Sequence, residues 1–422
     1  MKLKVCCDRI AGMVGNFLEH YDNALFGLLS PFIAPLFFEG KDPVTALIFT
    51  YSMLPLGLIA KPLGSLFFGW IGDYFGRRQA LSLSLTGMAI ITSIMGCIPL
   101  YKDIGPWAPF LLALSRMFQG FFSAGEVSGG AIFILERTLP SKRSLASSCY
   151  DAGSIGGVLF ASGLVTLMSS RGWIEQGWRY LFWTGGITAL IGVFLRQKIV
   201  EAPEFTKMPK IMEERRLFPV LKKHIQPFLG IFFAAGFSYT TYSLAFTLMN
   251  GFIPLITSLS KTQVMQVNTL LLIYDMLLLP AMGYLADRLG KEKVMIAGAI
   301  CSVFFALPMF YLLDHASLGT VIAVRLMIIS SGVAFSAPYY AWAIERLPPR
   351  HRYLILSLAG ALGSQFIGAP TSAVSLWLYK TLGWSWAPGL YLQVTGAMAG
   401  LTVFLFMKKE KAISKLQTQN YF

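Results

Sequence analysis

Three polar residues between positions 116 and 126 have the spacing that places them on one face of a helix. The stretch reads RMFQGFFSAGE and carries a cation at Arg116, an amide at Gln119 and an anion at Glu126. At about 100° per residue, the three side chains fall within an arc of roughly 80°. Most of the residues between them are apolar, so the polar stripe would cross a hydrophobic helix. Such a stripe usually faces a polar cavity.

Two carboxyl groups occur near the chain start in a similarly apolar setting. Glu19 and Asp22 are three residues apart and therefore share a helix face. Both lie about 10 to 15 Å from the start of the apolar run at 1.5 Å per residue, and Glu126 lies at a matching depth in its own run. A carboxyl group at that depth can bind and release a proton as its access to water alternates. We expect Glu19, Asp22 and Glu126 to couple protons; the alternative is a structural ion pair or a permanently neutral acid.

The cations and polar groups of the same apolar runs are suited to an anionic ligand. Lys61 and Arg116 can each hold a substrate carboxylate, and the guanidinium of Arg116 stays charged. The alternative for Arg116 is a buried ion pair between helices, and for Lys61 a packing or gating role. Gln119 is expected to join them in binding substrate. Tyr339 and Tyr340, beside a proline, are the candidates from the second half of the chain, although such residues often pack or anchor at an interface instead.

The composition places these residues in a membrane protein. Hydrophobic residues make up 55% of the chain and charged residues 13%, with a mean hydropathy of +0.60. The apolar runs reach about 20 residues, the length of a membrane-spanning helix. Twelve spans are predicted, at residues 12–37, 45–71, 79–99, 108–135, 148–170, 178–196, 226–255, 262–285, 294–313, 317–343, 354–379 and 385–407. The first lacks the pattern of a cleaved signal peptide and is expected to be retained.

The net charge of +14 is distributed unevenly between the two sides of the predicted membrane protein. With both termini on the same side, 26 of the 35 basic residues lie on that side. The positive-inside rule then predicts that both termini are cytoplasmic. This asymmetry accounts for the basic charge without a nucleic-acid partner. We expect a multi-pass protein of the plasma membrane, the inner membrane in a bacterium.

The second half of the chain repeats the first. GWIGDYFGRR at residues 69–78 matches GYLADRLGKE at an offset of 214, and LERTLPSKR at residues 135–143 matches IERLPPRHR at an offset of 209. The same offset of 214 relates Lys61 to Asp275, a weaker candidate expected to meet Tyr239 or Tyr242. The repeat predicts two six-helix halves, residues 1–196 and 226–422, joined by a cytoplasmic linker at 197–225. Parallel repeats of this kind are typical of rocking transporters.

These motifs also carry a family resemblance over the whole chain. GWIGDYFGRR and RMFQG resemble signatures of the major facilitator superfamily. GNFLEHYDNALFG, KPLGSLFFGWIGDYFGRR, GWRYLF and EAPEF resemble its metabolite:proton symporter family, which includes proline/betaine and ketoglutarate permeases. The chain departs from that family at His20, Asn23 and Lys61, where Trp, Phe and Arg are usual, which affects the expected substrate rather than the fold.

The resemblance implies an all-α membrane fold of twelve helices in two halves related by a pseudo-two-fold axis. It also implies a latch at the cytoplasmic face for one of the alternating states, since the loop motifs place charges there. A merely solvated charge cluster is the alternative for this set. The latch candidates are Asp73, Arg77, Arg78, Glu136, Arg143, Asp287 and Lys291.

The resulting prediction is a secondary active transporter that couples proton entry to uptake of a small carboxylate-bearing metabolite. Dicarboxylates and oxo-acids fit the buried cations Lys61, Arg116 and Arg325, whereas proline or betaine fits the family equally well. A uniporter, an antiporter of organic anions, or a channel or receptor on the same scaffold are the alternatives. No catalytic triad, metal-ligand spacing or nucleotide-binding loop indicates an enzyme or an ATP-driven pump. The expected partners are the solute, protons and the lipid bilayer, with no cofactor, and no pattern indicates an oligomeric state.

Overall fold

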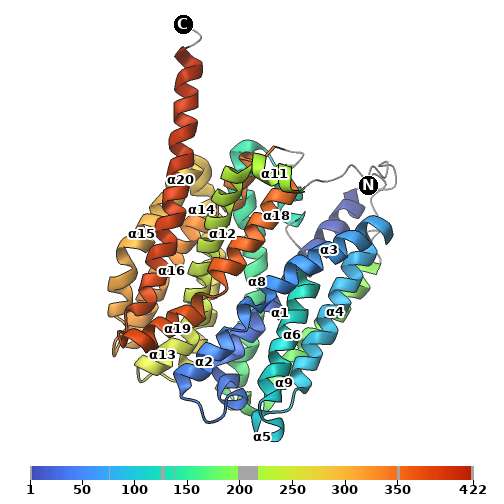
Figure 1. Ribbon diagram of the computed structural model, residues 1–422, viewed down its shortest axis with the longest axis vertical. Coiled ribbons are helices and arrows are strands. Elements are labelled where there is room, and N and C mark those ends of the chain that lie inside the picture. The colour runs from blue at the N-terminus through green and yellow to red at the C-terminus, as the bar shows by residue number, and fades with distance from the viewer. Residues whose placement is uncertain are drawn as a thin grey trace. The chain divides into compact units, whose positions relative to one another are not determined.

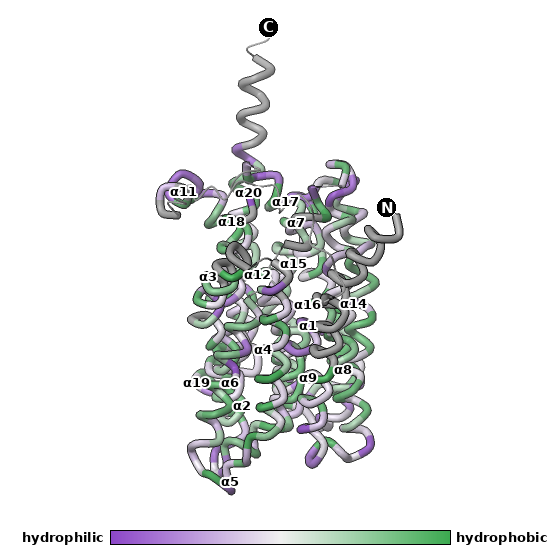
Figure 2. The backbone as a smooth tube through the Cα atoms, turned by 90° about the vertical axis from the view of Figure 1, so that its right-hand side faces the viewer, coloured by the Kyte–Doolittle hydropathy of each residue, from purple (hydrophilic) through white to green (hydrophobic). Residues whose placement is uncertain are grey.

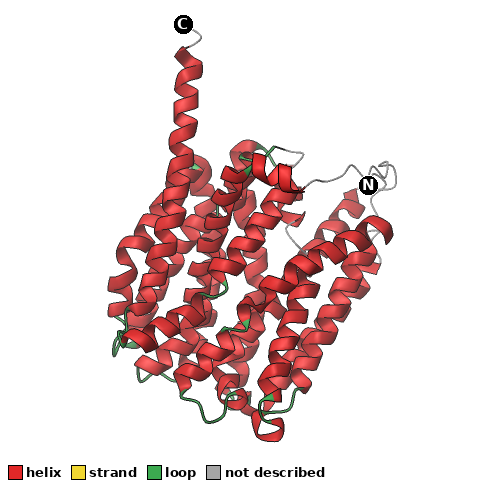
Figure 3. Ribbon diagram, in the orientation of Figure 1, coloured by secondary structure: helices red, strands yellow, loops and turns green. Residues whose placement is uncertain are grey.

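The computed structural model describes residues 2–75, 77–124, 129–136, 138–197, 217–348 and 352–419. Within these ranges the secondary structure is helical, and Figure 3 shows the helices joined by loops and short turns. Contacts divide the chain into two compact units. Most of the predicted linker, along with Glu126, lies outside the described residues.

Unit 1 comprises Met1–Gly130, Gly153–His224 and Ser260–Leu272. Its core lies along the first helix, where Leu25 and Phe26 pack with Trp178 and Phe182 of the last long helix. It also includes residues 153–170 of α8 (Arg143–Ser170) and 261–272 of α14 (Lys261–Leu289). Its other helices are α1 (Lys2–Phe37), α2 (Pro43–Tyr51), η1 (Leu54–Leu56), α3 (Gly57–Phe75), α4 (Arg77–Cys97), α5 (Tyr101–Ile104), α6 (Trp107–Ser123), α9 (Ile174–Gln197) and α11 (Leu217–Lys223).

Unit 2 comprises Ala131–Ala152, Ile225–Leu259 and Ile273–Phe422. Within it, α12 and α18 run side by side (Figure 1). Its elements are α7 (Gly129–Glu136), η3 (Pro140–Lys142), the first part of α8 (Arg143–Ser170), α12 (Ile225–Ser243), η4 (Leu244–Leu248), α13 (Met249–Ile256), the second part of α14 (Lys261–Leu289), α15 (Lys291–Tyr311), α16 (Leu318–Ser336), α17 (Tyr339–Glu345), α18 (Arg352–Gly363), η5 (Ser364–Gly368), α19 (Thr371–Leu382) and α20 (Ala387–Gln419).

Each of the twelve predicted spans coincides with helix in the described residues. Eight helical stretches of that part of the chain are long and apolar enough to cross a membrane, by length and composition. Hydrophobic residues predominate along α14 and α15 (Figure 2). The predicted boundaries of the two six-helix halves and of the linker between them stay a prediction.

In the described residues, at least four of the predicted spans are not continuous α-helices. The span at 317–343 is interrupted by a turn at Ala337 and Pro338, between α16 and α17. The span at 45–71 is interrupted between α2 and α3, where Pro55 lies in the short η1 turn. The spans at 226–255 and 354–379 each contain a five-residue π-helical turn, η4 and η5. A π turn shifts the backbone hydrogen-bond register, and such turns occur often at functional sites.

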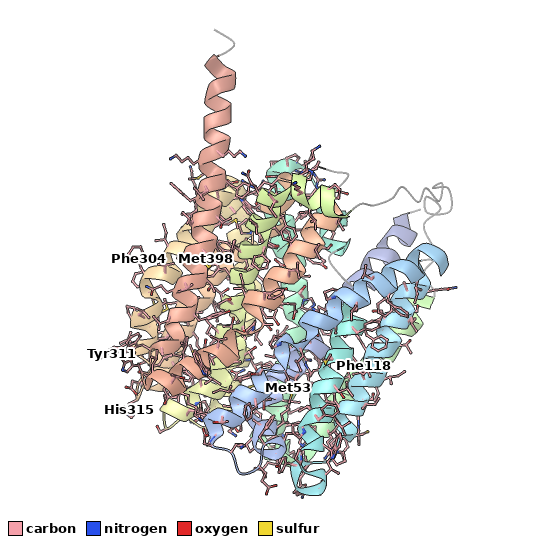
Figure 4. All side chains as sticks on the ribbon, in the orientation of Figure 1. Met53, Phe118, Phe304, Tyr311, His315 and Met398 are labelled. Carbon is pink, nitrogen blue, oxygen red and sulfur yellow. The ribbon has the colours of Figure 1, made fainter. Side chains whose placement is uncertain are left out.

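The outer faces of the long helices carry large apolar side chains. In unit 2, Phe304 and Tyr311 on α15 are 72% and 67% exposed, and Met398 on α20 is 42% exposed (Figure 4). Phe118 on α6 of unit 1 is also exposed. Exposed apolar surface of this extent marks a protein in contact with lipid.

A glycine lets two helices approach closely at a comparable place in each unit. In unit 1, a Cβ atom added to Gly157 of α8 would overlap the carbonyl oxygen of Phe17 on α1. In unit 2, a Cβ atom added to Gly363 of α18 would overlap the carbonyl oxygen of Phe232 on α12. Small residues permit such backbone contact in membrane helices. The internal repeat of the sequence therefore corresponds to a repeated helix contact.

Replacement of Gly157 by alanine should destabilise the protein. The added methyl group meets a backbone oxygen that cannot rotate away, and overpacking of this kind costs about 1–3 kcal/mol. We expect the apparent melting temperature of the detergent-solubilised protein, measured by loss of the monodisperse chromatographic peak, to fall by several degrees.

Gly153→Ala on the same helix is the matched control, because no atom lies within 4 Å of its added Cβ. Its melting temperature should stay unchanged or rise, since alanine is the better helix former. Equal melting temperatures for the two variants would contradict the close-contact interpretation.

Candidate functional site

Helix α1 carries two carboxyl groups into unit 1. Asp22 is only 2% exposed, and its Oδ1 atom lies against Gly185 of α9, where an added Cβ would overlap it. Glu19, one turn earlier, is half-buried and accepts a 3.5 Å hydrogen bond from Nδ2 of Asn23. The two acids interact electrostatically. As predicted from their spacing, they lie on one side of the helix.

Helix α6 places Arg116 and Gln119 in a short hydrogen-bonded chain. Arg116 donates from Nη1 to Oε1 of Gln119, which in turn donates from Nε2 to Oγ1 of Thr92 on α4 at 3.3 Å. The guanidinium also lies over the ring of Phe26, with its central carbon 4.6 Å from the ring centroid. Arg116 is 9% exposed and Gln119 1%. A neutral amide and a π face thus support a buried positive charge.

Lys61 of α3 joins these groups into one site. Its ammonium interacts electrostatically with Glu19 and with Arg116, so it lies near both a carboxylate and a second cation. Among the described residues, the structure shows no hydrogen bond or ion pair within 4.0 Å for Lys61. An anion that binds near Lys61 would be attracted by the positive charges of Lys61 and Arg116, and it would compete with the carboxylate of Glu19. We call Glu19, Asp22, Lys61, Arg116 and Gln119 the Lys61 cluster.

The two tyrosines predicted from the second half lie in unit 2 and are not part of the Lys61 cluster. The rings of Tyr339 and Tyr340, at the start of α17, are 5.0 Å apart between centroids. Tyr340 also meets the ring of Tyr150 on α8 edge to face at 6.3 Å. Tyr339 is buried, and its hydroxyl lies near Gly360 of α18.

Arg325, the counterpart of Arg116 in the repeat, has a different environment. It is fully buried and donates from Nη2 to the carbonyl oxygen of Ala245 at 2.7 Å and to Oδ1 of Asn250 at 3.4 Å. Ala245 belongs to the π turn η4, whose altered register leaves a carbonyl oxygen available. Arg325 therefore ties α16 to an irregular stretch of backbone.

Unit 2 also contains two acids, Asp275, which is buried, and Asp151, which is half-buried. Asp275 of α14 was expected to meet Tyr239 or Tyr242, and it interacts electrostatically with Tyr242 of α12. It also interacts with Asp151 of α8, which sequence reasoning missed. The signal was present, because Asp151 is an acid four residues into the predicted span at 148–170.

The predicted latch residues whose side chains the structure describes, Glu136, Arg143, Asp287 and Lys291, all lie in unit 2. Both carboxylate oxygens of Asp287 accept backbone hydrogen bonds at the start of α8, from Ser144 at 2.9 Å and Leu145 at 3.0 Å. A carboxylate at that position is favoured by the positive end of the helix dipole. Gly283, one turn before Asp287, allows the approach, because an added Cβ would overlap Ser148 of α8.

Ion pairs surround this helix end. Arg143 and Lys291 both contact Glu345 of α17, Arg143 at 3.5 Å. Glu136 pairs with Arg352 of α18 at 2.8 Å. Glu136 and Arg143 thus pair with residues from the second half of the sequence. The side chains of Asp73, Arg77 and Arg78 lie outside the described residues.

Comparison with protein families assigns each part of the chain to transporters. Residues 9–217 match the model of the sugar (and other) transporter family, and residues 228–420 match that of the major facilitator superfamily. A glycine betaine/proline/ectoine/pipecolic acid transporter from Dickeya dadantii is 30% identical over 417 residues, covering 94% of this chain and 82% of the relative. A proline/betaine transporter from Salmonella typhimurium is 29% identical over 414 residues, with the same coverage of 94% and 82%.

Solved structures support the same fold at lower sequence identity. A D-xylose–proton symporter superimposes with a TM-score of 0.73 at 16% identity, covering 95% of this chain and 96% of that one. The inward-open xylose transporter from Escherichia coli gives a TM-score of 0.70 at 17% identity, covering 95% of each chain. The family models and the curated relatives show that the protein is a multi-pass membrane transporter and not an enzyme, and the solved structures show the twelve-helix fold. The chain belongs to the major facilitator superfamily, and within it to the metabolite:proton symporter family that includes the proline/betaine transporters.

Proposed function

We propose that the protein is a proton-coupled symporter that takes up a small carboxylate-bearing solute of the proline or betaine kind. The observation that carries the proposal is the Lys61 cluster, in which a half-buried lysine interacts with both Glu19 and Arg116. Two cations near the same place favour a carboxylate ligand, and two acids on the adjoining helix can carry a proton. Relatives named as proline/betaine transporters favour a zwitterionic solute over a dicarboxylate.

Lys61 and Arg116 have different parts in this proposal. Arg116 is oriented by Gln119 and Phe26, so it supplies a fixed positive field. The side chain of Lys61 is flexible, so its ammonium can leave Glu19 and bind the carboxylate of an incoming solute. Binding of the solute and the charge state of Glu19 are then linked, since both act on the same ammonium.

Asp22, which is more buried than Glu19, is the proposed proton carrier. Its carboxyl is buried beside α9, and a proton on it removes the charge that α1 would otherwise carry through the membrane. Release of the proton creates a carboxylate close to Glu19 and therefore to Lys61. Alternating access would expose this group to each side in turn, with both termini of the chain in the cytoplasm.

Asp22→Asn should uncouple transport from the proton gradient. In proteoliposomes, we expect accumulation of labelled proline or betaine under an inward proton gradient to fall to the level seen without a gradient. Solute exchange at equal pH should continue, because the asparagine keeps the size of the side chain but cannot release a proton. Glu39→Gln is the control, since Glu39 is exposed at the end of α1. Full gradient-driven accumulation by Asp22→Asn would contradict the role.

Lys61→Met should weaken solute binding while the protein remains folded. Loss of a hydrogen bond to a charged group removes about 1.5–3 kcal/mol, which corresponds to a roughly 10- to 150-fold higher KM. The measurement is the concentration dependence of uptake, with Lys41→Met as the control because Lys41 is exposed in the loop after α1. An unchanged KM in Lys61→Met would exclude Lys61 as the carboxylate ligand.

The charge network around Asp287 is proposed to stabilise one of the alternating states. Asp287→Asn removes the anion from the start of α8 and presents an amide N–H₂ to one of two backbone N–H groups. We expect Vmax to fall about fivefold with little change in KM, since 1 kcal/mol of helix-end stabilisation corresponds to that factor. Asp314→Asn, at an exposed turn, is the control. A Vmax equal to that of the control would argue for a solvated charge cluster.

A further inference from the structure

Thr92 of α4 lies between two parts of the Lys61 cluster. Its Oγ1 atom accepts a 3.3 Å hydrogen bond from Nε2 of Gln119, and Oε1 of that amide accepts from Arg116. A Cβ atom added to Gly185 of α9 would overlap Oδ1 of Asp22 and would lie 3.0 Å from Cγ2, the methyl carbon of Thr92. The methyl group of Thr92 and the carboxyl group of Asp22 therefore lie against the same residue of α9.

The carboxyl group of Asp22 has an unsatisfied acceptor. Asp22 is 2% exposed, and its Oδ1 atom has no hydrogen-bond partner in the part of the chain that the structure describes. Buried polar atoms are nearly always hydrogen-bonded, so this oxygen indicates a donor that is turned away in the present state. The neighbouring hydroxyl of Tyr21 is engaged elsewhere, 2.8 Å from Oγ1 of Thr184 and 3.2 Å from the carbonyl oxygen of Leu181.

The hydroxyl of Thr92 has a matching donor. A hydroxyl group can donate one hydrogen bond and accept two. Thr92 is fully buried and accepts from Gln119, but among the described residues the structure shows no hydrogen bond that it donates. Thr86 and Ser93 on the same helix both donate to a carbonyl oxygen one turn earlier, each at 2.8 Å. Thr92 thus differs from its neighbours in keeping its donor available.

Rotation about one side-chain bond would bring this donor to Asp22. The hydroxyl and methyl groups of threonine occupy staggered positions on Cβ about 120° apart. Threonine populates two such rotamers in helices, so the change between them is favourable enough to occur. It would move Oγ1 to the place that Cγ2 now takes beside Asp22, and away from Gln119. The hydroxyl can therefore serve the amide or the carboxyl group, according to its rotamer.

The protonation state of Asp22 decides which rotamer is preferred. Glu19 and Tyr21 of α1 interact electrostatically with Asp22, whereas α4 and α9 bring the uncharged Thr92 and Gly185 to it. The other charged groups of the cluster interact with Glu19 or with each other, namely Lys61 and Arg116. A carboxylate accepts a hydrogen bond about twice as strong as that of a neutral group. A charged Asp22 thus attracts the hydroxyl of Thr92, and a protonated one leaves it with Gln119.

We propose that Thr92 is a positioning residue that couples the proton on Asp22 to the orientation of Arg116. While Asp22 is protonated, the hydroxyl of Thr92 orients Gln119, which orients the guanidinium for the carboxylate of the solute. When Asp22 releases its proton to water, the hydroxyl keeps its own proton, rotates and donates a hydrogen bond to the new carboxylate. Gln119 then loses its partner, and the solute binds more weakly. The inference rests on the proposed function, in which Asp22 carries the coupled proton.

Two substitutions of Thr92 separate its hydroxyl from its shape. Thr92→Val keeps the shape and removes the hydroxyl, whereas Thr92→Ser keeps the hydroxyl. The dissociation constant of labelled proline or betaine is measured from acidic to alkaline pH on the purified full chain in detergent. In the wild-type protein we expect it to rise about fivefold with pH, the factor for one neutral hydrogen bond. Asp22→Asn should keep the low value at every pH, because its side chain stays neutral.

Thr92→Val should lose the dependence on pH. Its dissociation constant should equal the high wild-type value at every pH, because Gln119 then has no acceptor in either state. Thr92→Ser should keep the rise, and Thr86→Val, the same change on the same helix, should behave as wild type. A full rise in Thr92→Val, or its loss in Thr92→Ser, would overturn the proposal. Should Thr92→Val fail to fold, Thr92→Ala, which also lacks the hydroxyl, provides the same comparison.

Infrared difference spectra separate this inference from the proposed function. Spectra of the purified protein at acidic and alkaline pH are subtracted, and the carboxylate band of Asp22 is identified by its absence in Asp22→Asn. We expect this band to shift in Thr92→Val but not in Thr92→Ser or Thr86→Val, since only the first lacks the donor.

The two proposals fail in different ways. A shifted band in Thr92→Val, together with wild-type uptake that ignores the proton gradient, would reject the proposed function alone. An unshifted band together with gradient-driven uptake would reject the role of Thr92 alone. Absence of any carboxylate band from Asp22 would reject both, because the acid would then not release a proton.

Discussion

A charge inside a membrane is stable only where other polar groups or rings lie against it, and this requirement determines how each unit is built. In unit 1 the guanidinium of Arg116 is supported by Gln119 on the same helix, and Gln119 is supported by Thr92 on α4. The ring of Phe26 covers the cation from α1. The position of one charge therefore depends on the packing of α1, α4 and α6. The environment of Lys61, which interacts with Arg116, depends on the same packing.

Unit 2 meets the same requirement with irregular backbone. The π turn η4 presents the carbonyl oxygen of Ala245 to Arg325, and the π turn η5 presents that of Ile367 to the hydroxyl of Tyr391 at 2.6 Å. In both cases a polar side chain from another helix binds a carbonyl within the shifted register. Each turn thus interrupts the regular α-helix and accepts a hydrogen bond from a side chain of another helix. Broken helices at membrane depth are tolerated where such partners exist.

The sequence predicts those features that depend on one helix alone. The shared face of Arg116 and Gln119 follows from the helical period, and the structure shows them hydrogen-bonded. Asp287 was a latch candidate, but its hydrogen bonds to the start of α8 could not be identified from spacing. Thr92 and Asp151 were not found, because their roles depend on which helices become neighbours. A single sequence contains no direct record of those contacts.

The π turns were not predicted either, since no residue type marks a π turn in a single sequence. The repeat identified Lys61 and Asp275 as equivalent positions of opposite charge. Equivalent positions in the two halves of a repeated fold lie at comparable depth in the membrane. The side chain at each position decides whether the charge there is positive or negative. The polar partners differ accordingly: an acid and a guanidinium interact with Lys61, and a second acid and a phenol interact with Asp275. A repeated fold can thus carry a lysine in one unit and an acid at the corresponding position of the other, each with polar partners of its own.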